Sequence, residues 1–479
     1  MTALPAVQPQ TFNCLLHRKR IIEDIDLSSL TQIVSQLDHP SILGGSKIDS
    51  SNYSYWTAEP IDTFEFAANQ QGPFEKLQLC LDRYRLNNAN KENLPPGIFC
   101  GGWIGYFAYE LGRYIEKIPQ TTHDDINMPL IRLCFYDKVI CYDHAENCFW
   151  LFVLQTNAKD AIKPKFSSLQ NWLEKAKNTK RLQPYKADLN SPDITAVKSN
   201  MTRAYYHEGL AKIKKHIIDG DVYQVNFAQR FSCQYTQPPI SLYHWQNTHN
   251  PSPYAAYIDT GSSQIVSASP ELFIQIQDRK IKTTPIKGTR PRLSGGGPQI
   301  IAINKTHHNQ LLTSKKEQAE LNMIIDIERN DLGRICRYGT IEVTQPRTIT
   351  PYPTLFHAVA TVTGHLRDEI TFPQILGAMF PGGSITGAPK ISSMHIIDHL
   401  EPNTRGVYTG CIGFIGINSN VCLNIAIRTI IISKNKAFCH AGGGIVADSN
   451  AEAEFNETML KAKALIAAMT DIEKIQDKK

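Results

Sequence analysis

The chain has 479 residues, of which 20% are charged and 42% hydrophobic, and 50 Lys and Arg residues against 45 Asp and Glu residues give a formal net charge of +5. This composition is typical of a globular protein, and the length is enough for two to four domains or one large one. A nearly balanced charge without blocks of like charge gives no electrostatic reason to expect nucleic acid or an anionic membrane as a partner.

The start of the chain and its cysteines indicate the cellular compartment. The first twenty residues lack the basic start, apolar core and cleavage site of a secretion signal, and no later stretch approaches 18 uncharged apolar residues. The 11 cysteines are odd in number, scattered and without a Cys-x-x-Cys pair, which favours reduced thiols over a disulfide framework or a zinc site. We therefore expect a cytoplasmic protein that does not span a membrane.

Strand patterns dominate the N-terminal part of the chain. Residues 97–112 contain glycines among aromatic residues, and residues 131–143 and 147–155 are β-branched and aromatic runs separated by a turn-like segment. The chain then turns polar, with one short amphipathic piece at residues 169–176. We therefore divide the chain into a β-rich region (1–155), a linker (156–200), a catalytic region (201–470) and a polar tail (471–479).

Helix and strand patterns alternate through the second half of the chain, without a fixed repeat period. The helices are predicted at residues 202–220, 315–334, from 390 onward and 449–469. The strands are predicted at residues 222–231, 263–276, 279–285, 339–345, 357–366 and 421–432. Hairpin-like strand pairs with interspersed helices predict an α+β fold with large, mostly antiparallel sheets.

Two of the predicted helices each carry a pair of glutamates three residues apart. Glu317 and Glu320 share one face of the helix at 315–334, away from its apolar side. Glu454 and Glu457 repeat the arrangement on the last helix, and Lys461 lies one turn beyond Glu457. Each helix therefore projects two carboxylates together.

Taken singly, each pair also fits a solvated helix face or a capping box, with Ser314 before Glu317 and Ser449 before Glu452. If both pairs faced one pocket, four carboxylates would repel one another unless protons or a divalent cation lay between them. Mg²⁺ suits such a site because it takes one or two protein carboxylates and leaves positions for water and an anionic ligand.

A predicted strand and a run of glycines supply candidate groups for binding an anion. In the strand at 421–432, Asn424, Ala426 and Arg428 share the less apolar face. The following run of glycines, residues 442–444, lets backbone N–H groups approach a ligand closely. An exposed strand arginine and a glycine-rich bulge are the alternative interpretations.

Lys287 stands beside a glycine on a turn that follows a predicted strand. A lysine nucleophile has to lose its proton, which requires burial or neighbouring positive charge to lower its pKa; a surface turn residue is the alternative.

The glycine-rich turn at residues 380–390 superficially suggests a phosphate cradle, but it matches neither G-x-x-x-x-G-K-[ST] nor G-x-G-x-x-G after a strand. Nucleotide binding is therefore not expected.

Taken together, the motifs resemble the chorismate-utilising enzyme family. Between about residues 205 and 467 they occur in the family's order: GDVYQVNFAQRF, SASPELF, PIKGTRPR, AELNMIIDIERNDLGRICR, FPGGSITGAPK, AIRT, AGGGIVADS and EAEFNETMLKAKA. The segment GGWIGYFAYELGR is similar to the family's N-terminal region, whereas the first 95 residues match weakly. The resemblance implies a two-layered sheet core with outer helices and a catalytic pocket between the sheets.

The same resemblance implies the residues of a magnesium site. Glu320 and Glu457 would ligate Mg²⁺, which bridges to the ring carboxylate of chorismate, while Glu317 and Glu454 would act mainly through water. The substrate would be held by a further set of groups: Arg428, Tyr408, Gly443, Gly444, Lys461, Thr386, His357, Gly288 and Thr289.

Two positions separate the reactions within the family. Gln224 stands where isochorismate- and salicylate-forming members need a lysine to activate water, so water is not the expected nucleophile. Lys287 stands where anthranilate-forming members carry alanine and where the members that aminate chorismate at C4 carry a nucleophilic lysine. The resemblance therefore implies amination at C4, with Lys287 as covalent nucleophile and Glu271 as general acid.

The implied reaction needs ammonia, and the chain has no recognisable glutaminase Cys-His-Glu module. A separate glutamine amidotransferase subunit, forming a heterodimer with this chain, is therefore expected, and the product would be 4-amino-4-deoxychorismate on the route to 4-aminobenzoate and folate. An anthranilate-forming enzyme and a noncatalytic subunit that binds a small acid are the alternatives. The Leu-Leu-Glu-Ser motif of tryptophan-inhibited members is missing near residues 52–60, so strong tryptophan feedback is not expected.

Overall fold

The computed structural model describes residues 11–45, 52–87, 94–180, 194–293, 295–352 and 355–476. Within these residues the strands form two sheets, one of 13 strands and one of 10. Apart from the parallel pair of β1 with β5, the described strand pairings are antiparallel. The predicted α+β class with large, mostly antiparallel sheets is confirmed.

The order of strands in each sheet follows from these pairings. The larger sheet runs from edge to edge as β10 (Lys198–Ser199), β11 (Gln224–Gln234), β23 (Lys436–Ile445), β22 (Thr429–Ser433), β13 (Ser263–Ser269), β12 (Tyr254–Asp259), β2 (Ser41–Leu43), β3 (Tyr53–Thr57), β8 (Lys138–Asp143), β9 (Cys148–Gln155), β1 (Phe12–Ile21) and β5 (Tyr84–Leu86), with β19 (Gly387–Ala388) paired to β11. The smaller sheet runs as β16 (Ile286–Pro291), β18 (Leu355–His365), β15 (Lys280–Thr284), β14 (Leu272–Gln277), β21 (Val421–Ile425), β20 (Cys411–Gly416), β6 (Gly102–Phe107), β7 (Ile131–Tyr136) and β4 (Asp62–Phe66), with β17 (Glu342–Pro351) paired to β18.

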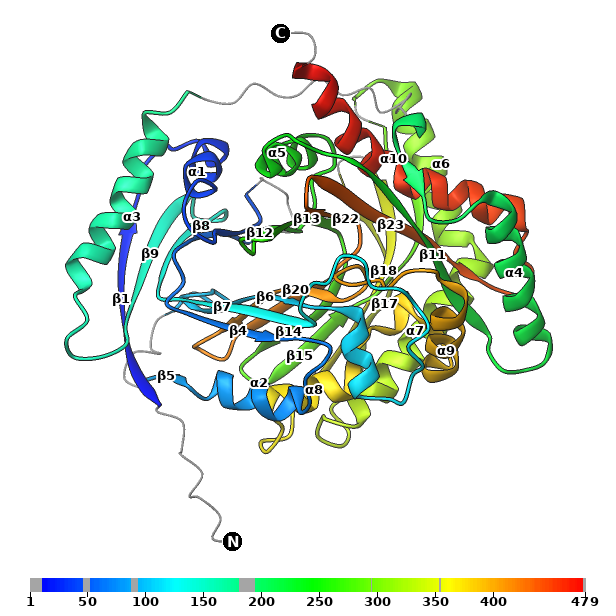
Figure 1. Cartoon of the computed structure of the whole chain (residues 1–479), viewed down its shortest axis with the longest axis horizontal. Helices are drawn as coiled ribbons and strands as arrows, with labels where there is room; N and C mark the ends of the chain where they lie inside the picture. Colours follow the sequence, from blue (N-terminus) through cyan, green and yellow to red (C-terminus); the bar gives the residue numbers. More distant parts are fainter. Residues whose placement is uncertain are drawn as a thin grey trace, which may run out of the picture.

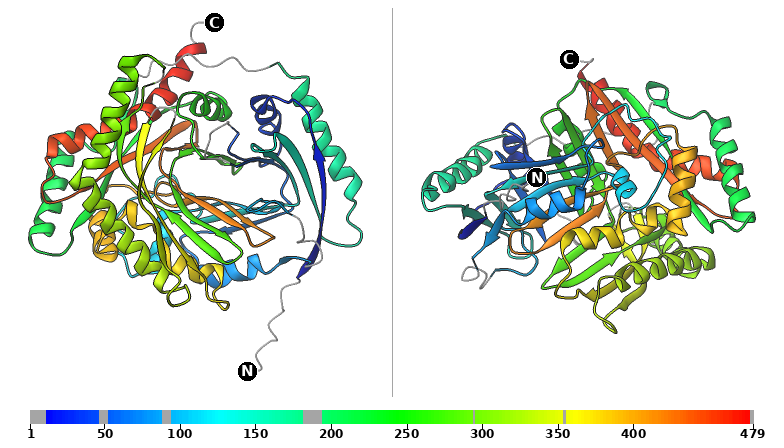
Figure 2. Two further views of the ribbon diagram at one scale, coloured as in Figure 1. Left: turned by 180° about the vertical axis from the view of Figure 1, so that it is seen from behind. Right: turned by 60° about the horizontal axis from the view of Figure 1, so that its bottom comes forward.

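Helices cover the outside of the sheets, as Figures 1 and 2 show. They are α1 (Leu27–Val34), α2 (Pro73–Leu81), α3 (Ile162–Lys177), α4 (Arg203–Ile218), α5 (Pro239–His249), α6 (Pro298–Thr313), α7 (Lys315–Gly333), α8 (Phe372–Met379), α9 (Lys390–Leu400) and α10 (Ala451–Gln476), with the 3₁₀ turns η2 (Tyr109–Tyr114), η3 (Ile194–Ala196) and η4 (Gly383–Ile385). In Figure 1, α1 and α3 lie on the side of β1 and β9, and α4, α7, α9 and α10 lie on the side of β11 and β23.

The larger sheet is buried on both faces, and strand β22 shows how. Ile430 and Ile432 pack into a cluster that includes residues of α3, α5 and α10. Ile431 packs into the main core, which includes residues of the smaller sheet. Because successive strand residues point to opposite faces, one face of this sheet meets the other sheet and the opposite face meets the helices.

The predicted continuous strand at 421–432 is wrong. The chain leaves the smaller sheet after Ile425 and enters the larger sheet at Thr429, and Arg428 between them has a positive φ of 51°. The alternation of apolar residues continues across the break, because the strands on both sides of it are buried. The sequence pattern therefore predicts one strand where there are two. Arg428 therefore lies where the chain crosses from one sheet to the other, instead of on a strand face.

The predicted caps of the two glutamate helices have different outcomes. Ser314 is the N-cap of α7, where its hydroxyl accepts a hydrogen bond from the Glu317 backbone N–H at 3.3 Å. The first turn of α10 is instead capped by Asn450, whose side-chain oxygen accepts from the backbone N–H groups of Glu452 and the next residue at 3.1 Å each. A capping box from Ser449 is therefore wrong.

Both sheets combine strands from the two ends of the chain. In the larger sheet β12 pairs with β2, and in the smaller sheet β20 pairs with β6. Within the predicted linker at 156–200, α3 is a helix of 16 residues, and residues 181–193 lie outside the described part of the chain. Helix α10 continues through residues 471–476 of the predicted tail, and residues 477–479 lie outside the description.

Candidate active site

Lys287 lies where several elements meet. It is on β16, which packs against α7, and its Nζ lies 3.7 Å from Oε2 of Glu320 on that helix. Glu271, Glu457 and Lys461 also act electrostatically on the ammonium group. Burial lowers the pKa of Lys287, Lys461 lowers it further, and the glutamates oppose the shift only in part. The amine is thus easier to deprotonate than that of an exposed lysine.

The C-terminal end of β23 leaves room beside this lysine. A Cβ atom on Gly444 would lie 3.1 Å from Lys287 Nζ and 2.9 Å from the side-chain amide of Gln224. Gln224 is on β11, and its buried Oε1 and Nε2 have no hydrogen-bond partner among the described residues. Gly443 faces the last helix, where its Cβ would lie 3.4 Å from Glu454 and 3.8 Å from Lys461. These glycines lie within a regular antiparallel strand pair, β11 with β23, rather than in a bulge.

Glu271 is the buried acid of the site. It lies between β13 and β14, is 4% exposed, accepts a hydrogen bond from the Ile286 backbone N–H at 3.3 Å, and has a hydrogen bond with the Ser384 side chain. Burial raises the pKa of Glu271 to about 7, and these hydrogen bonds and Lys287 offset the effect only in part. Glu271 therefore holds its proton through the acidic range up to about neutrality.

The glutamates of α7 and α10 differ in their partners. Glu317 pairs with Arg290 at 2.8 Å, and its carboxyl carbon would lie 3.0 Å from a Cβ on Gly288, which has a φ of +87°. Glu457 pairs with Lys461 at 2.8 Å, and its side chain is 52% exposed. Glu454 accepts a hydrogen bond from the Ser449 hydroxyl at 2.7 Å.

The charge states of the two α10 glutamates also differ. Although burial alone would raise the pKa of Glu457, the neighbouring lysines, Lys461 first, leave it below its usual value. Burial raises the pKa of Glu454, and the charge of Glu457 adds to the effect. Glu457 is therefore ionised at neutral pH.

The carboxylates fit a small metal site with two protein ligands. No group of three or more His, Cys, Asp or Glu side chains that could hold a metal ion occurs in the described part of the chain. Glu320 on α7 and Glu457 on α10 nevertheless both act on Lys287, so the two helices bring one carboxylate each toward the same place. Two carboxylates are within the number that Mg²⁺ takes from a protein.

A second set of residues lies around Arg428. Burial lowers the pKa of its guanidinium to about 10, and Tyr352 and His357 both interact with its charge. The Thr289 hydroxyl and His357 Nδ1 are 2.9 Å apart, and the rings of Tyr352 and His357 meet edge to face at 5.1 Å. Burial first, and then Arg428, lowers the pKa of His357 to about 3, so this imidazole is neutral. Arg428 is the cationic group of this set.

Two of the predicted substrate residues have mainly structural contacts. Tyr408 stacks on His440 with ring centroids 4.8 Å apart, and the Arg405 guanidinium lies 5.8 Å from its ring. No described contact joins Tyr408 to Lys287 or Arg428. The Thr386 hydroxyl donates to the Gly382 carbonyl at 3.0 Å within the glycine-rich turn. The turn also places Thr386 just before β19, which pairs with Gln224 and its neighbour on β11.

Three residues of the site were not predicted from the sequence: Ser384, Tyr352 and Glu328. Ser384 lies within the glycine-rich motif, so the sequence marks its position, but nothing in the sequence indicates its contact with Glu271. Tyr352 follows β17, which extends beyond the strand predicted at 339–345. Glu328 reads as one more charged residue on α7, but it is buried. The sequence carries no local signal for its burial.

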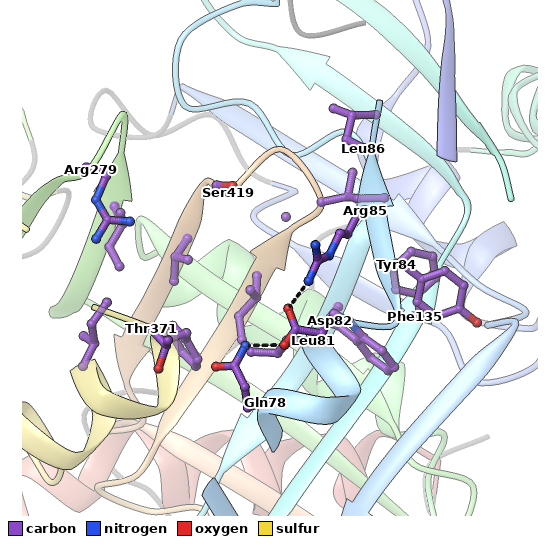
Figure 3. Close-up of a pocket in the computed structure, with 18 of the residues that line it drawn as sticks. Gln78, Leu81, Asp82, Tyr84, Arg85, Leu86, Phe135, Arg279, Thr371 and Ser419 are labelled. Carbon is purple, nitrogen blue, oxygen red and sulfur yellow. Dashed lines mark hydrogen bonds and ion pairs between the residues drawn. The ribbon is translucent and has the colours of Figure 1, made fainter. Parts of the chain in front are cut away.

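Two sizeable surface cavities lie away from these residues. One, of about 820 Å³, is lined by Gln78, Asp82, Arg85 and Arg279 among others, and Figure 3 shows Asp82 between Gln78 and Arg85. Another, of about 780 Å³, lies between α7, α8 and α9. None of the predicted site residues lines either cavity, so converging side chains rather than cavity size locate the candidate site. No described helix is both long and apolar enough to cross a membrane.

Comparisons with known proteins agree with the sequence motifs. A sequence model of the chorismate binding enzyme family matches residues 45–467. Aminodeoxychorismate synthase component 1 of Bacillus subtilis (strain 168) is 38% identical over 376 residues, covering 78% of this chain and 77% of the relative. Anthranilate synthase component 1 of Acetivibrio thermocellus is 35% identical over 414 residues, covering 84% of this chain and 81% of the relative. The crystal structure of anthranilate synthase component I from Streptococcus pneumoniae TIGR4 superimposes with a TM-score of 0.76 at 28% identity, covering 88% of this chain and 93% of that one.

Proposed function

The chain belongs to the family of chorismate-binding enzymes, and on that premise we propose that it replaces the C4 hydroxyl of chorismate with an amino group, giving 4-amino-4-deoxychorismate. The observation that carries the proposal is the pairing of a buried amine with a buried acid. Lys287 has a lowered pKa and Glu271 a raised one, so burial favours the free amine on the lysine and the retained proton on the glutamate.

The first step uses both groups. The unprotonated Nζ of Lys287 attacks C2 of the ring, both ring double bonds shift by one position, and the C–O bond at C4 breaks. Glu271 gives its proton to the departing oxygen, which leaves as water. A covalent bond now joins Lys287 to the ring at C2.

The second step reverses the allylic displacement. Ammonia attacks C4, both double bonds shift back, and the C2–N bond to Lys287 breaks, which regenerates the lysine amine. Two displacements thus replace one difficult substitution. Gln224 supports ammonia rather than water as the nucleophile, because its neutral amide cannot serve as the base that would activate water.

The remaining residues hold the substrate. The bidentate guanidinium of Arg428 suits a carboxylate of chorismate, and the neutral His357 and the Thr289 hydroxyl lie beside it. Lys461 and the backbone of Gly443 and Gly444 would hold the other carboxylate. Thr386, Gly288 and Tyr408 complete the proposed binding set.

Glu320 and Glu457 would hold a magnesium ion, with Glu317 and Glu454 as neighbouring carboxylates. When bound, Mg²⁺ would supply positive charge that holds the substrate carboxylate beside these two glutamates. We expect Glu457→Gln to raise the Mg²⁺ concentration needed for half-maximal activity by about tenfold or more. Full activity of the wild-type enzyme in excess chelator would contradict the metal assignment.

Ammonia would come from glutamine through a separate amidotransferase subunit. The relatives named component 1 support a two-component enzyme. We expect glutamine-dependent activity only with that subunit, while ammonium salts alone support turnover by this chain.

The deciding experiment identifies the product of the purified chain with chorismate, Mg²⁺ and an ammonium salt by mass spectrometry. A product with the C4 hydroxyl replaced by an amine and with the enolpyruvyl group retained is expected. Anthranilate together with free pyruvate would instead support the anthranilate-forming alternative, which Lys287 argues against. No turnover with either nitrogen source, even with the amidotransferase present, would favour a binding role.

A further inference from the structure

A second buried carboxylic acid lies behind Glu271 and takes no part in the steps above. Glu328 on α7 is 3% exposed and accepts a hydrogen bond from the Gly383 backbone N–H. Its Oε2 has no hydrogen-bond partner among the described residues. Burying an ionised carboxylate with one oxygen unpaired is costly, so the protonated form is favoured. Burial, followed by the charge of Asp331, raises the pKa of Glu328 to about 8.

One short turn contacts both acids. Gly383 and Ser384 are consecutive residues of η4; the first donates to Glu328 and the second is hydrogen-bonded to Glu271. The negative charge of Glu271 adds to the groups that raise the pKa of Glu328. A negative charge on Glu271 therefore favours the protonated form of Glu328.

The other side of Glu328 leads toward solvent. Asp331 follows it by one helical turn and pairs with Lys390 Nζ at 2.6 Å. Asp331 and Lys390 both line the 780 Å³ cavity between α7, α8 and α9. Glu328 thus interacts both with the acid of the site and with an ion pair that lines this cavity.

The titratable and charged neighbours of the two acids lie on α7, α9 and β16 and directly after β17. Glu328 faces Asp331 on its own helix and Lys390 on α9. Glu271 faces Lys287 on β16, and its charge also acts on Tyr352, which follows β17. The hydrogen bonds from η4 complete these surroundings, so Glu328 is the protonated group on the side of Glu271 that faces α7.

We propose that Glu328 is a proton-relay residue that returns a proton to Glu271 after each turnover. The proposal rests on the proposed function, in which loss of the C4 hydroxyl as water consumes the proton of Glu271. The new amine leaves as an ammonium group that keeps all three protons of the attacking ammonia, so ammonia does not return this proton. An O–H bond breaks at Glu328 and one forms at Glu271, and Glu328 regains a proton from water at the Asp331 and Lys390 end.

Substitution of Glu328 by Gln tests the relay, because Gln keeps the shape and the acceptor for Gly383 but cannot release a proton. We expect E328Q to lower kcat at least about tenfold while KM for chorismate and ammonium changes little. The loss should grow as pH rises above about 7, where Glu271 is increasingly without its proton. The matched control is D326N, an exposed carboxylate on the same helix that pairs with Arg329 at 3.2 Å, and its kcat should equal that of the wild type.

Two further variants separate proton transfer from packing. Glu328→Asp keeps a carboxyl group and should recover most of the lost kcat. Glu328→Ala leaves space for a small acid, and formate should restore part of its kcat in a concentration-dependent way. Unfolding curves of all variants establish that each is folded under the assay conditions.

Several outcomes would overturn the relay. One is that E328Q keeps the wild-type kcat across about pH 6 to 9. Another is that the loss of kcat does not depend on pH and formate does not restore kcat to Glu328→Ala. A third is that only KM for ammonium changes. In each case the variant still aminates chorismate at C4, so the proposed function stands. Failure of the wild-type chain to aminate C4 would instead refute the proposed function.

Discussion

At the scale of single residues, the chemistry depends on burial moving two pKa values in opposite directions. An amine and a carboxyl group in the same low-dielectric surroundings both lose part of their charged form, so more of the lysine is the nucleophilic free amine and more of the glutamate keeps a proton to donate. Lys287 and Glu271 are placed to use both effects. The residue types could be read from the sequence, but their burial could not.

Substitution of Lys287 by Ala tests the nucleophile. We expect K287A to lower kcat/KM for amination at least about 100-fold, because direct attack by ammonia is the harder substitution. Wild-type enzyme given chorismate without ammonia should gain the mass of chorismate less water, and K287A should not. Lys280→Ala, at the exposed start of β15, is the control and should behave as the wild type. Full activity of K287A would refute the covalent step.

The pH dependence of activity and stability tests Glu271. Wild-type kcat should fall as pH rises through about 7, because the acid loses its proton. The E271Q variant should turn over much more slowly, and its kcat should not show this fall with pH.

The same shift predicts how stability depends on pH. The folded-state pKa of Glu271 lies above the ordinary value of a glutamate, so the group costs stability as pH rises toward and through about 7. From pH 5 to 8, E271Q should gain up to about 3 kcal/mol of unfolding free energy relative to the wild type. Parallel stability curves for the two proteins would contradict the raised pKa.

At the scale of secondary-structure elements, β23 and the crossing between β21 and β22 shape the site. β23 pairs closely with β11 and carries glycines where it passes Gln224 and Lys287. At the crossing, the chain changes sheets within three residues and leaves Arg428 between them. Alternation of apolar residues predicted strands on both sides but gave no sign of the break, because both strands are buried.

Replacing Gly444 by Ala tests the space beside Lys287. The new Cβ would lie 3.1 Å from Lys287 Nζ and 2.9 Å from the Gln224 amide, so these side chains must move. Inserting a methyl group into a packed site costs about 1–3 kcal/mol, so kcat/KM for chorismate should fall roughly tenfold to 100-fold. Gly377→Ala on α8, where nothing lies within 4 Å of the new Cβ, should leave kcat/KM unchanged and stabilise the fold by up to about 1 kcal/mol. Equal kinetics of the two variants would show that Gly444 does not border the substrate.

At the scale of the whole molecule, the two sheets join the ends of the chain. Strands of the N-terminal 155 residues form one end of each sheet, and those after residue 197 form the other. A buried ionic group strengthens this connection: Glu110 of η2 accepts from the Arg405 backbone N–H at 2.7 Å, and the Arg405 guanidinium pairs with Glu401 at 2.6 Å. The predicted catalytic region therefore shares its core with the N-terminal region.

A fragment of residues 201–479 tests this connection. Removing the N-terminal strands exposes the edges of β12 and β20 and the apolar faces behind them. We expect the fragment to show no cooperative unfolding transition and no C4 amination, and co-expression of residues 1–200 to restore both in part. A soluble fragment with a cooperative thermal transition would show that the C-terminal region folds as an independent domain.

The sequence by itself determined what is local or carried by a motif: the helices at 203–218 and 315–333, most of the strands of the second half, the family resemblance and the identity of Lys287, Glu271 and the paired glutamates. Periodicity reports one element at a time, because it reflects which face of that element is buried. Only the tertiary structure decided that β11, β16 and β23 meet α7 and α10 in one place, that Arg428 lies between the sheets, and that Glu328 is buried behind Glu271. These features depend on contacts between residues far apart in the chain, and burial by such contacts is what sets the pKa values on which the chemistry depends.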